Sequence, residues 1–428
     1  MTDFTIDQLG DCHFPSPFSS MMNIHFRTET ERLLFRPEVN AGIAGVELTD
    51  DKTMELSGPR EKLFFDPPEV RAAIVTCGGL CPGLNAVIRG LVMQLWHIYG
   101  VRGILGLRYG YHGLGDEAVE PFQLTPDQVN GIKGEGGTIL GSSRGTPPTP
   151  ELVDNLVRRK IDILFVIGGD GSMRGADALW AEIKQRGLNI AVVGIPKTID
   201  NDIPFVRRTF GFDTAVAEAM KAINVAEIEA RGMPNGIGIV KLMGRYAGFI
   251  AATACVASGQ ANFCLVPELK FGLEGEGGLL NLLRERLQAR GHAVIVVAEG
   301  AGQELVQSDS HDASGNRKLG DIGAYLRQEI MAYCNANAIS CGIKYIEPSY
   351  LIRSAPPTAS DQLYCDQLAR AAVHAAMAGR TGMLIGNWNN RLVHVPFHAL
   401  EGQTQRLNPE GELWFSVREN TGQPQIIG

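Results

Sequence analysis

From residue 71 onward, short apolar runs rich in valine and isoleucine alternate with longer segments of helical pattern. The apolar runs lie at 72–76, 104–107, 163–167, 190–194, 237–241, 263–266 and 293–298, and the helical segments at 84–99, 150–159, 175–186, 214–231, 245–258, 278–288 and 321–335. Because the runs are continuously apolar, we expect strands that are buried on both faces, as in parallel sheets. Strands and helices in series place helices on either side of such sheets. The sequence therefore predicts an α/β fold with two doubly wound, mainly parallel lobes.

The length of the chain also predicts more than one domain. Its 428 residues exceed the roughly 100–200 residues of a typical domain. Residues 1–70 lack the alternating pattern, and a helix at 361–379 and a strand at 381–386 come late in the chain. We expect an N-terminal extension at 1–70, a first α/β lobe at 71–210, a second at 211–350, and C-terminal elements at 351–428 that return to the lobes.

Composition and charge exclude several classes of protein. Apolar residues make up 44% and charged residues 20%, as in a globular protein. The net charge is −8 without a long basic run, which argues against a nucleic-acid partner. The eight cysteines are too sparse for a disulfide scaffold. No apolar stretch approaches the ~18 residues of a membrane span, and the N-terminus lacks a signal-peptide pattern. We therefore expect a cytoplasmic protein with reduced thiols and no membrane partner.

Glycine-rich loops follow two of the predicted strands. Residues 78–85 read Gly-Gly-Leu-Cys-Pro-Gly-Leu-Asn, and residues 168–172 read Gly-Gly-Asp-Gly-Ser. In an open parallel sheet ligands bind beyond the carboxyl ends of the strands, where glycine lets backbone amides approach an anion. A carboxylate there, Asp170, would repel phosphate unless a divalent metal lies between them. The first loop is equally well explained by a tight turn without a ligand. The second loop predicts nucleotide phosphate with Mg²⁺, and an aspartate turn that caps the next helix is the alternative.

The loop after the predicted strand at 190–194 carries the reactive groups. It reads Ile-Pro-Lys-Thr-Ile-Asp-Asn-Asp, so that Asp200 and Asp202 lie near Lys197 and Thr198. Phosphoryl transfer to an alcohol needs a carboxylate that takes the hydroxyl proton and cations that offset the phosphate charge. We expect this loop to be catalytic, and two surface carboxylates that cap local turns are the alternative.

Charged residues also stand in the other predicted loops. Arg144, Arg245 and Arg353 suit bidentate recognition of phosphate, and Glu299 could accept sugar hydroxyls. A lone arginine is as often a solvated surface residue. The chain has no P-loop, dinucleotide-binding or His-Glu-x-x-His motif. Residues 141–145 do spell Gly-x-Ser-x-Gly, but without the strand and helix that a nucleophile elbow requires.

Taken in order, these loops resemble those of the 6-phosphofructokinases over about residues 71–400. The matching motifs lie at 78–85, 168–172, 196–202, 210–215 (Phe-Gly-Phe-Asp-Thr-Ala), 241–245 (Lys-Leu-Met-Gly-Arg), 297–300 (Val-Ala-Glu-Gly) and 350–353 (Tyr-Leu-Ile-Arg). The Gly-Gly-Asp-Gly element alone also occurs in NAD kinases and lipid kinases. The combination of Lys197, Gly171 and an N-terminal extension is most similar to the ATP-dependent branch of plant and trypanosome type.

The resemblance implies a role for each matched residue. Asp200 would deprotonate the 1-hydroxyl of fructose 6-phosphate, and Thr198 and Asp202 would position the transferred phosphate and the metal. Asp170 would hold Mg²⁺. The nucleotide would be lined by Gly79, Arg144, Gly145, Gly169, Gly171 and Ser172. The sugar phosphate would contact Thr198, Ile199, Asp200, Met243, Gly244, Arg245, Glu299, Tyr350 and Arg353.

The chain departs from the bacterial ATP-dependent pattern at several of these positions. Many such enzymes carry glycine in place of Lys197 and histidine in place of Tyr350. Gly236 stands where those enzymes carry an arginine that reaches the sugar phosphate from a neighbouring subunit, so the resemblance does not imply that contact. Of the bacterial effector arginines only Arg89 is retained, and ADP regulation is therefore not implied.

Two of these residues, Lys197 and Gly171, bear on the choice of phosphoryl donor, and they favour different donors. Pyrophosphate-dependent relatives share Lys197 but carry aspartate in place of Gly171, where it would collide with the α-phosphate of a nucleotide. The steric and electrostatic block that an aspartate at position 171 would impose on a nucleotide is a stronger constraint than the added cation of Lys197. We therefore expect ATP as the donor. The predicted function is ATP-dependent phosphorylation of fructose 6-phosphate to fructose 1,6-bisphosphate, in glycolysis, by a homo-oligomer (a dimer or tetramer). A pyrophosphate-dependent enzyme is the alternative, and an inactive nucleotide or sugar-phosphate sensor a remote one.

Overall fold

The computed structural model describes residues 3–20, 23–36, 49, 52–306 and 318–428. Contacts along the chain divide it into two compact units. Unit 1 comprises Met1–Thr198, Ile203–Gly211 and Pro356–Gln403, and unit 2 comprises Ile199–Asp202, Phe212–Ala355 and Thr404–Gly428. The chain thus passes between the units more than once, while the bounds of the four predicted segments stay predictions.

Unit 1 is built on a seven-stranded sheet in the order β17-β16-β10-β9-β6-β7-β8. Its strands are β6 (Arg71–Thr76), β7 (Gly103–Leu107), β8 (Phe122–Gln123), β9 (Ile163–Gly168), β10 (Ala191–Pro196), β16 (Met383–Trp388) and β17 (Arg391–Pro396). The inner strands run parallel, and β8 and β17 at the edges are antiparallel to their neighbours. All residues of β9 and β10 are buried, because helices cover the sheet on both faces.

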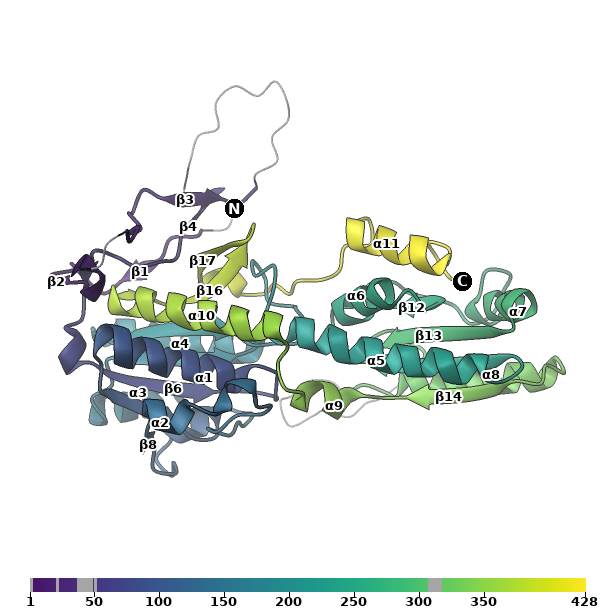
Figure 1. Ribbon diagram of the computed structural model, residues 1–428, viewed down its shortest axis with the longest axis horizontal. Coiled ribbons are helices and arrows are strands. Elements are labelled where there is room, and N and C mark those ends of the chain that lie inside the picture. The colour runs from purple at the N-terminus through teal and green to yellow at the C-terminus, as the bar shows by residue number, and fades with distance from the viewer. Residues whose placement is uncertain (1–2, 21–22, 37–48, 50–51, 307–317) are drawn as a thin grey trace, which may run out of the picture. The chain divides into compact units, whose positions relative to one another are not determined.

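The helices of unit 1 form a layer on each face of the sheet (Figure 1). They are α1 (Leu84–Met93), continued by a π-helical turn at Gln94–Tyr99, α2 (Pro126–Val129), α3 (Thr149–Arg158), α4 (Asp170–Gln185) and α10 (Ala359–Met377). α1 packs against α10, and α3 packs against α4. Leu164 and Val166 of β9 share a core with residues of α3 and α4. Since side chains alternate along a strand, Phe165 points to the opposite face.

The described part of the N-terminal segment is an integral layer of unit 1. Its strands are β1 (Asp7–Gln8), β2 (Phe14–Pro15), β3 (Arg32–Leu34), β4 (Thr53–Glu55) and β5 (Lys62–Leu63). β1 pairs with β15 (Arg380–Thr381), and a bridge between Leu56 and Val393 joins the segment to β17. Phe4 and Met54 are completely buried in the core of unit 1. The segment therefore contributes both backbone pairing and apolar side chains to this unit.

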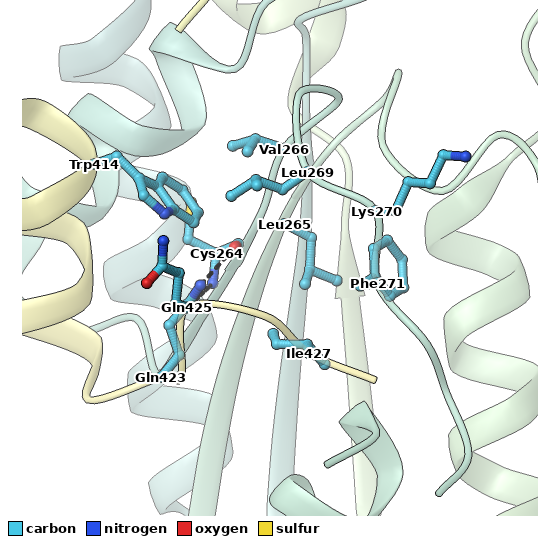
Figure 2. A pocket seen from close by; sticks show the side chains of 10 residues that line it. All are labelled: Cys264, Leu265, Val266, Leu269, Lys270, Phe271, Trp414, Gln423, Gln425 and Ile427. Atoms are coloured by element: carbon cyan, nitrogen blue, oxygen red, sulfur yellow. Dashed lines mark hydrogen bonds between the residues drawn. The ribbon is translucent and has the colours of Figure 1, made fainter. Parts of the chain in front are cut away.

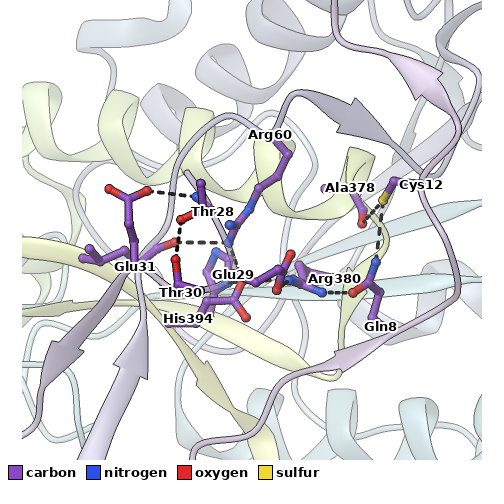
Figure 3. A network of polar contacts seen from close by, with 12 residues as sticks. Gln8, Cys12, Thr28, Glu29, Thr30, Glu31, Arg60, Ala378, Arg380 and His394 are labelled. Atoms are coloured by element: carbon purple, nitrogen blue, oxygen red, sulfur yellow. Dashed lines mark hydrogen bonds and ion pairs between the residues drawn. The ribbon is translucent and has the colours of Figure 1, made fainter. Parts of the chain in front are cut away.

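A buried ionic cluster ties the N-terminal segment to the strands that follow α10 (Figure 3). Oε1 of Glu55 lies 2.5 Å from Nη2 of Arg60, 2.9 Å from Nε of Arg380 and 3.2 Å from Nδ1 of His394. Arg380 is also ion paired with Glu29. Burial raises the pKa of Glu55, but the hydrogen bond from His394 and the charges of Arg380 and Arg60 outweigh it and hold the pKa well below its usual value.

Unit 2 is built on a four-stranded parallel sheet in the order β12-β13-β11-β14. Its strands are β11 (Gly236–Leu242), β12 (Phe263–Leu265), β13 (His292–Ala298) and β14 (Gly342–Ile346), and its helices are α5 (Phe212–Arg231), α6 (Phe249–Ser258), α7 (Leu279–Arg290), α8 (Ile322–Ala336), α9 (Ser349–Ser354) and α11 (Glu412–Thr421). α5 packs against α6 and β11, and α8 packs against β11 and β14. Leucines of α7 and isoleucines of α8 fill one core with the apolar residues of β13.

The residues after α11 contact the edge strand β12 through Gln423 (Figure 2). The side-chain amide of Gln423 accepts a 2.7 Å hydrogen bond from the backbone nitrogen of Cys264 and donates a 3.2 Å bond to its carbonyl oxygen. Trp414 and Ile427 line a small pocket beside this contact. The C-terminal segment therefore covers an edge of the sheet that has no neighbouring strand.

The structure confirms the predicted fold class and corrects several element boundaries. α4 begins at Asp170 and not at 175, and α6 begins at Phe249 and not at 245. β14, β17, α9 and α11 were not predicted. The eight cysteines all lie in the described residues, and none of them forms a disulfide. Within the described part of the chain, no helix has the length and apolar character needed to cross a membrane.

Candidate functional site

Three of the predicted loops extend from adjacent strands of the unit 1 sheet. β9 lies between β6 and β10, and all three strands run parallel, so their carboxyl ends share one edge of the sheet. From β6 the chain continues to β7 on one side and later to β9 on the other. The order of the strands therefore reverses between β6 and β9, which is where open α/β sheets bind their ligands.

The first loop follows β6 and is fixed by the segment that holds Arg144. The backbone nitrogen of Gly78 donates to the carbonyl oxygen of Ser143 at 3.0 Å, and the hydroxyl of Ser142 donates to the carbonyl oxygen of Gly78 at 2.5 Å. Gly78 has a φ of 84°, a conformation that favours glycine. These bonds place the predicted residues at 142–145 beside the glycine loop, as a nucleotide site at this strand end requires.

The second loop is in fact the beginning of α4. Gly169 is the residue before the helix, and its carbonyl oxygen accepts hydrogen bonds from the nitrogens of Ser172 and Met173. Asp170 and Gly171 therefore occupy the first turn, where backbone amides lack partners within the helix and an anion is favoured. A buried phenol, that of Tyr111, donates to the carbonyl oxygen of Ser172 at 2.6 Å.

Lys197 connects the ends of all three strands. It directly follows β10, and its backbone nitrogen donates to the carbonyl oxygen of Gly168 at the end of β9. Its buried ammonium donates to the carbonyl oxygen of Gly79 after β6 at 2.8 Å. The charge of Lys197 is thus held beside the first glycine loop, where it could offset the charge of a phosphate.

The backbone of Thr198 is held by residues that sequence reasoning missed. The hydroxyl of Thr209, which is completely buried, donates to the carbonyl oxygen of Thr198 at 2.7 Å. The segment around Thr209 is itself fixed by α10, since Asp361 accepts a 3.0 Å bond from the nitrogen of Gly211 and Tyr364 donates 2.6 Å to the carbonyl oxygen of Arg208. No local pattern could have revealed them, because α10 follows about 150 residues later.

Asp200 and Asp202 belong to unit 2. The backbone nitrogen of Gln405 donates to the carbonyl oxygen of Asp202 at 2.9 Å, and its side-chain nitrogen donates to that of Asn201 at 2.8 Å. Asn201 has a φ of 55°, which turns the chain sharply between the two carboxylates. Gln405 is a second residue that the sequence alone did not single out.

In unit 2 the predicted sugar-phosphate residues follow neighbouring strands. The nitrogen of Glu299, after β13, donates to the carbonyl oxygen of Leu242 in β11 at 2.8 Å, and the nitrogen of Gly300 donates to that of Gly244 at 3.1 Å. A Cβ atom on Gly300 would lie 1.9 Å from the carbonyl oxygen of Arg245, so only glycine permits this approach. The loops that hold Glu299 and Arg245 are therefore in direct contact.

The charges that act on the buried carboxyl group of Glu299 include both predicted arginines of unit 2. Burial raises the pKa of Glu299, and the nearby charges of Arg245, Lys241 and Arg353 only partly offset this effect. Lys241 is already paired with Asp321 and Glu347, at 2.9 and 3.1 Å. One carboxyl group surrounded by arginines can bind a hydroxyl group, while the arginines bind an anion.

Tyr350 and Arg353 lie on the short helix α9, which follows β14, and not in a loop as predicted. The guanidinium of Arg353 lies 5.0 Å from the centre of the Tyr350 ring. Nε of Arg353 is buried and has no hydrogen-bond partner among the described residues. The Tyr350 ring thus covers one side of the guanidinium, while Tyr350 itself is 79% exposed. Gly236 is the first residue of β11, whereas Arg245 follows the carboxyl end of the same strand.

The carboxylates fit a metal that arrives with a nucleotide. The described residues contain no group of three or more histidine, cysteine, aspartate or glutamate side chains that could hold an ion. Asp170 is the one acidic residue in the first turn of α4. Mg²⁺ commonly takes one or two carboxylates and completes its shell with phosphate oxygens and water. A single aspartate at the N-terminus of a helix has this character.

Comparison with known proteins identifies the family. Residues 71–376 match the family described as Phosphofructokinase. The chain is 47% identical to "ATP-dependent 6-phosphofructokinase" of Amycolatopsis methanolica over all of this chain and 96% of that protein. It is 49% identical to "ATP-dependent 6-phosphofructokinase 7" of Arabidopsis thaliana over 87% of this chain and 77% of that protein. A solved pyrophosphate-dependent phosphofructokinase from Marinobacter aquaeolei shares the fold, with a TM-score of 0.68 at 21% identity over 84% of this chain and 92% of that one. The chain belongs to the phosphofructokinase family, as its loops predicted.

Proposed function

We propose that this protein transfers the γ-phosphoryl group of ATP to the 1-hydroxyl of fructose 6-phosphate. The observation that carries the proposal is the open space at Gly171. A Cβ atom built there would meet Nη2 of Arg174 at 3.7 Å and no other side chain of the described residues within 4 Å. A nucleotide α-phosphate can therefore approach this turn. The names of the relatives from Amycolatopsis methanolica and Arabidopsis thaliana support the same donor.

In the proposed reaction, Asp200 takes the proton of the 1-hydroxyl while the oxygen attacks the γ-phosphorus. Thr198 and Asp202 orient the transferred group, and Lys197 offsets its charge. Thr198 and Asp200 are two residues apart, so one short stretch of backbone carries groups for both reactants. This stretch is fixed by Thr209 on one side and Gln405 on the other.

The proposed acceptor half consists of the residues around Glu299. Arg245 and Arg353 bind the 6-phosphate, and Glu299 bonds to sugar hydroxyls, with Met243, Gly244 and Tyr350 completing the walls. A buried arginine nitrogen without a partner supports this assignment, because such a group is costly unless a ligand satisfies it. Asp170 is proposed to hold Mg²⁺, which supplies positive charge at the phosphates. The expected homo-oligomer and the cytoplasmic location stay predictions.

Lys197 and the solved Marinobacter structure keep pyrophosphate as a second candidate donor. An assay that couples formation of fructose 1,6-bisphosphate to a visible readout, run separately with ATP and with pyrophosphate, tests the proposal. Turnover with ATP is expected. Turnover with pyrophosphate alone would contradict the choice of donor, and no turnover with either would favour the sensor.

A further inference from the structure

Arg174 lies one helical turn beyond Asp170 on α4. Its Nη1 atom is ion paired with Oδ2 of Asp170, and its Nη2 atom is the side-chain group that a Cβ atom on Gly171 would meet. Gly171 is the residue that leaves space for a nucleotide in the proposed site. The guanidinium therefore borders that space, although no sequence motif had singled out Arg174.

The ion pair alone gives little reason for an arginine at this position. The Arg174 side chain is 66% exposed, and exposed pairs four residues apart contribute little to the stability of a helix. The N-terminal end of a helix is also its positive end, which disfavours a cation and already favours Asp170. An arginine there becomes favourable when further negative charge is present.

We propose that Arg174 binds the α-phosphate of the nucleotide donor, and that its pair with Asp170 opens when the nucleotide binds. The inference rests on the proposed function. A nucleotide with its metal offers Asp170 a cation and Arg174 an anion. Each group then exchanges one opposite charge for another, so the opening leaves neither charge uncompensated. The fork of the guanidinium suits phosphate oxygens, which a point charge matches less well.

The same geometry makes Arg174 a second determinant of the donor. An aspartate at position 171 would place its carboxylate within reach of Nη2 of Arg174. Such an aspartate would occupy the space of the α-phosphate. It would also pair with the guanidinium of Arg174, which would then no longer be available to the α-phosphate. Choice of donor would then depend on the pair of residues 171 and 174, and not on residue 171 alone.

The test compares Arg174→Met with Arg186→Met by calorimetric titration of ATP, ADP, pyrophosphate and fructose 6-phosphate, with Mg²⁺ present. Arg186 lies just after the far end of α4 and is likewise paired, with Glu182 and Asp154. We expect Arg174→Met to bind ATP and ADP about tenfold more weakly, as for loss of one charge-assisted bond. Its affinity for pyrophosphate and fructose 6-phosphate should match wild type, as should all affinities of Arg186→Met.

Three results would overturn the inference: ATP affinity of Arg174→Met within twofold of wild type, an equal loss for pyrophosphate, or an equal loss for fructose 6-phosphate. The second would assign Arg174 to the other phosphates, and the third would indicate a disturbed helix. Failure of the proposed function is visible separately, because wild-type protein would then fail to turn over ATP.

Discussion

The buried hydroxyl of Thr209 donates a 2.7 Å hydrogen bond to the carbonyl oxygen of Thr198. The two residues are eleven apart in the chain, and the segment of Thr209 is anchored in turn by Asp361 and Tyr364 of α10. The backbone that leads into the proposed base, Asp200, is therefore fixed by side chains that need not touch a substrate. Their effect should appear in the rate of turnover more than in substrate binding.

Replacing Thr209 with valine keeps the shape of the side chain and removes the hydrogen bond. Loss of one buried bond costs about 1 kcal/mol and up to 3 kcal/mol where the partner is left unsatisfied. We expect kcat to fall roughly tenfold while KM for fructose 6-phosphate changes little. Thr209→Ser keeps the donor and should recover most of the activity. Equal losses in both variants would mean that the methyl group, and not the bond, is what matters.

Asp200→Asn removes the proposed base without changing its size. General bases contribute roughly 10²–10⁴-fold, so kcat should fall by that factor. Binding of fructose 6-phosphate, measured by calorimetry, should stay near wild type. Near-normal kcat would require another proton acceptor.

Alanine at Arg245 or Arg353 should weaken binding of the sugar phosphate. A charge-assisted bond to phosphate contributes about 1.5–3 kcal/mol, which corresponds to a rise in KM of roughly tenfold or more. KM for the donor should change much less. Arg327→Ala, at an exposed position of α8, serves as the control. If KM for the donor rises equally, these arginines serve the donor and not the sugar.

Gly171→Asp tests the choice of donor within a fold that tolerates the change. The added side chain meets only the flexible end of Arg174, and an aspartate in the first turn of a helix is favourable. We expect ATP-dependent turnover to collapse while the melting temperature and sugar-phosphate binding are retained. Gly171→Ala adds the Cβ atom without the charge and should retain more activity. Full ATP turnover in Gly171→Asp would refute the steric argument.

The Glu55 cluster predicts how stability depends on pH. Glu55 has a folded pKa below its ordinary value of 4.5, so its ionised form stabilises the fold above that pH, and the contribution is lost as the pH falls further. Glu55→Gln leaves Arg60 and Arg380 without their buried partner, which costs about 3–5 kcal/mol. The melting temperature should therefore drop strongly at pH 7, and the gap to wild type should narrow below pH 4.5. Glu182→Gln, in a surface pair on α4, should show neither effect.

The sequence predicted those parts of the molecule that depend on local patterns. Continuous apolar runs correspond to strands because the covering helices bury nearly all of their residues, with Leu105 of β7 half-buried. The start of α4 was misplaced because glycines at 168–171 suggested a loop, whereas Gly171 takes part in the helix. α9 is only six residues long and carries no helical period of its own.

The supports of the candidate site could not be predicted in the same way. Thr209, Asp361 and Gln405 act through single hydrogen bonds to backbone atoms, and two of these bonds join residues 150 and 204 positions apart. Such contacts produce no characteristic residue spacing or composition, so no pattern in the sequence can reveal them. The ion pair of Asp170 with Arg174 is local, but its place beside Gly171 becomes visible only in three dimensions.

The amide of Gln423 also has a consequence for self-association. By taking up the nitrogen and carbonyl oxygen of Cys264, it satisfies the groups through which an exposed edge strand recruits another chain. One side chain here imitates the backbone of a neighbouring strand, and it does so without extending the sheet. Loss of this amide would expose the backbone groups of Cys264 and leave the border of unit 2 as a template for β-sheet aggregation.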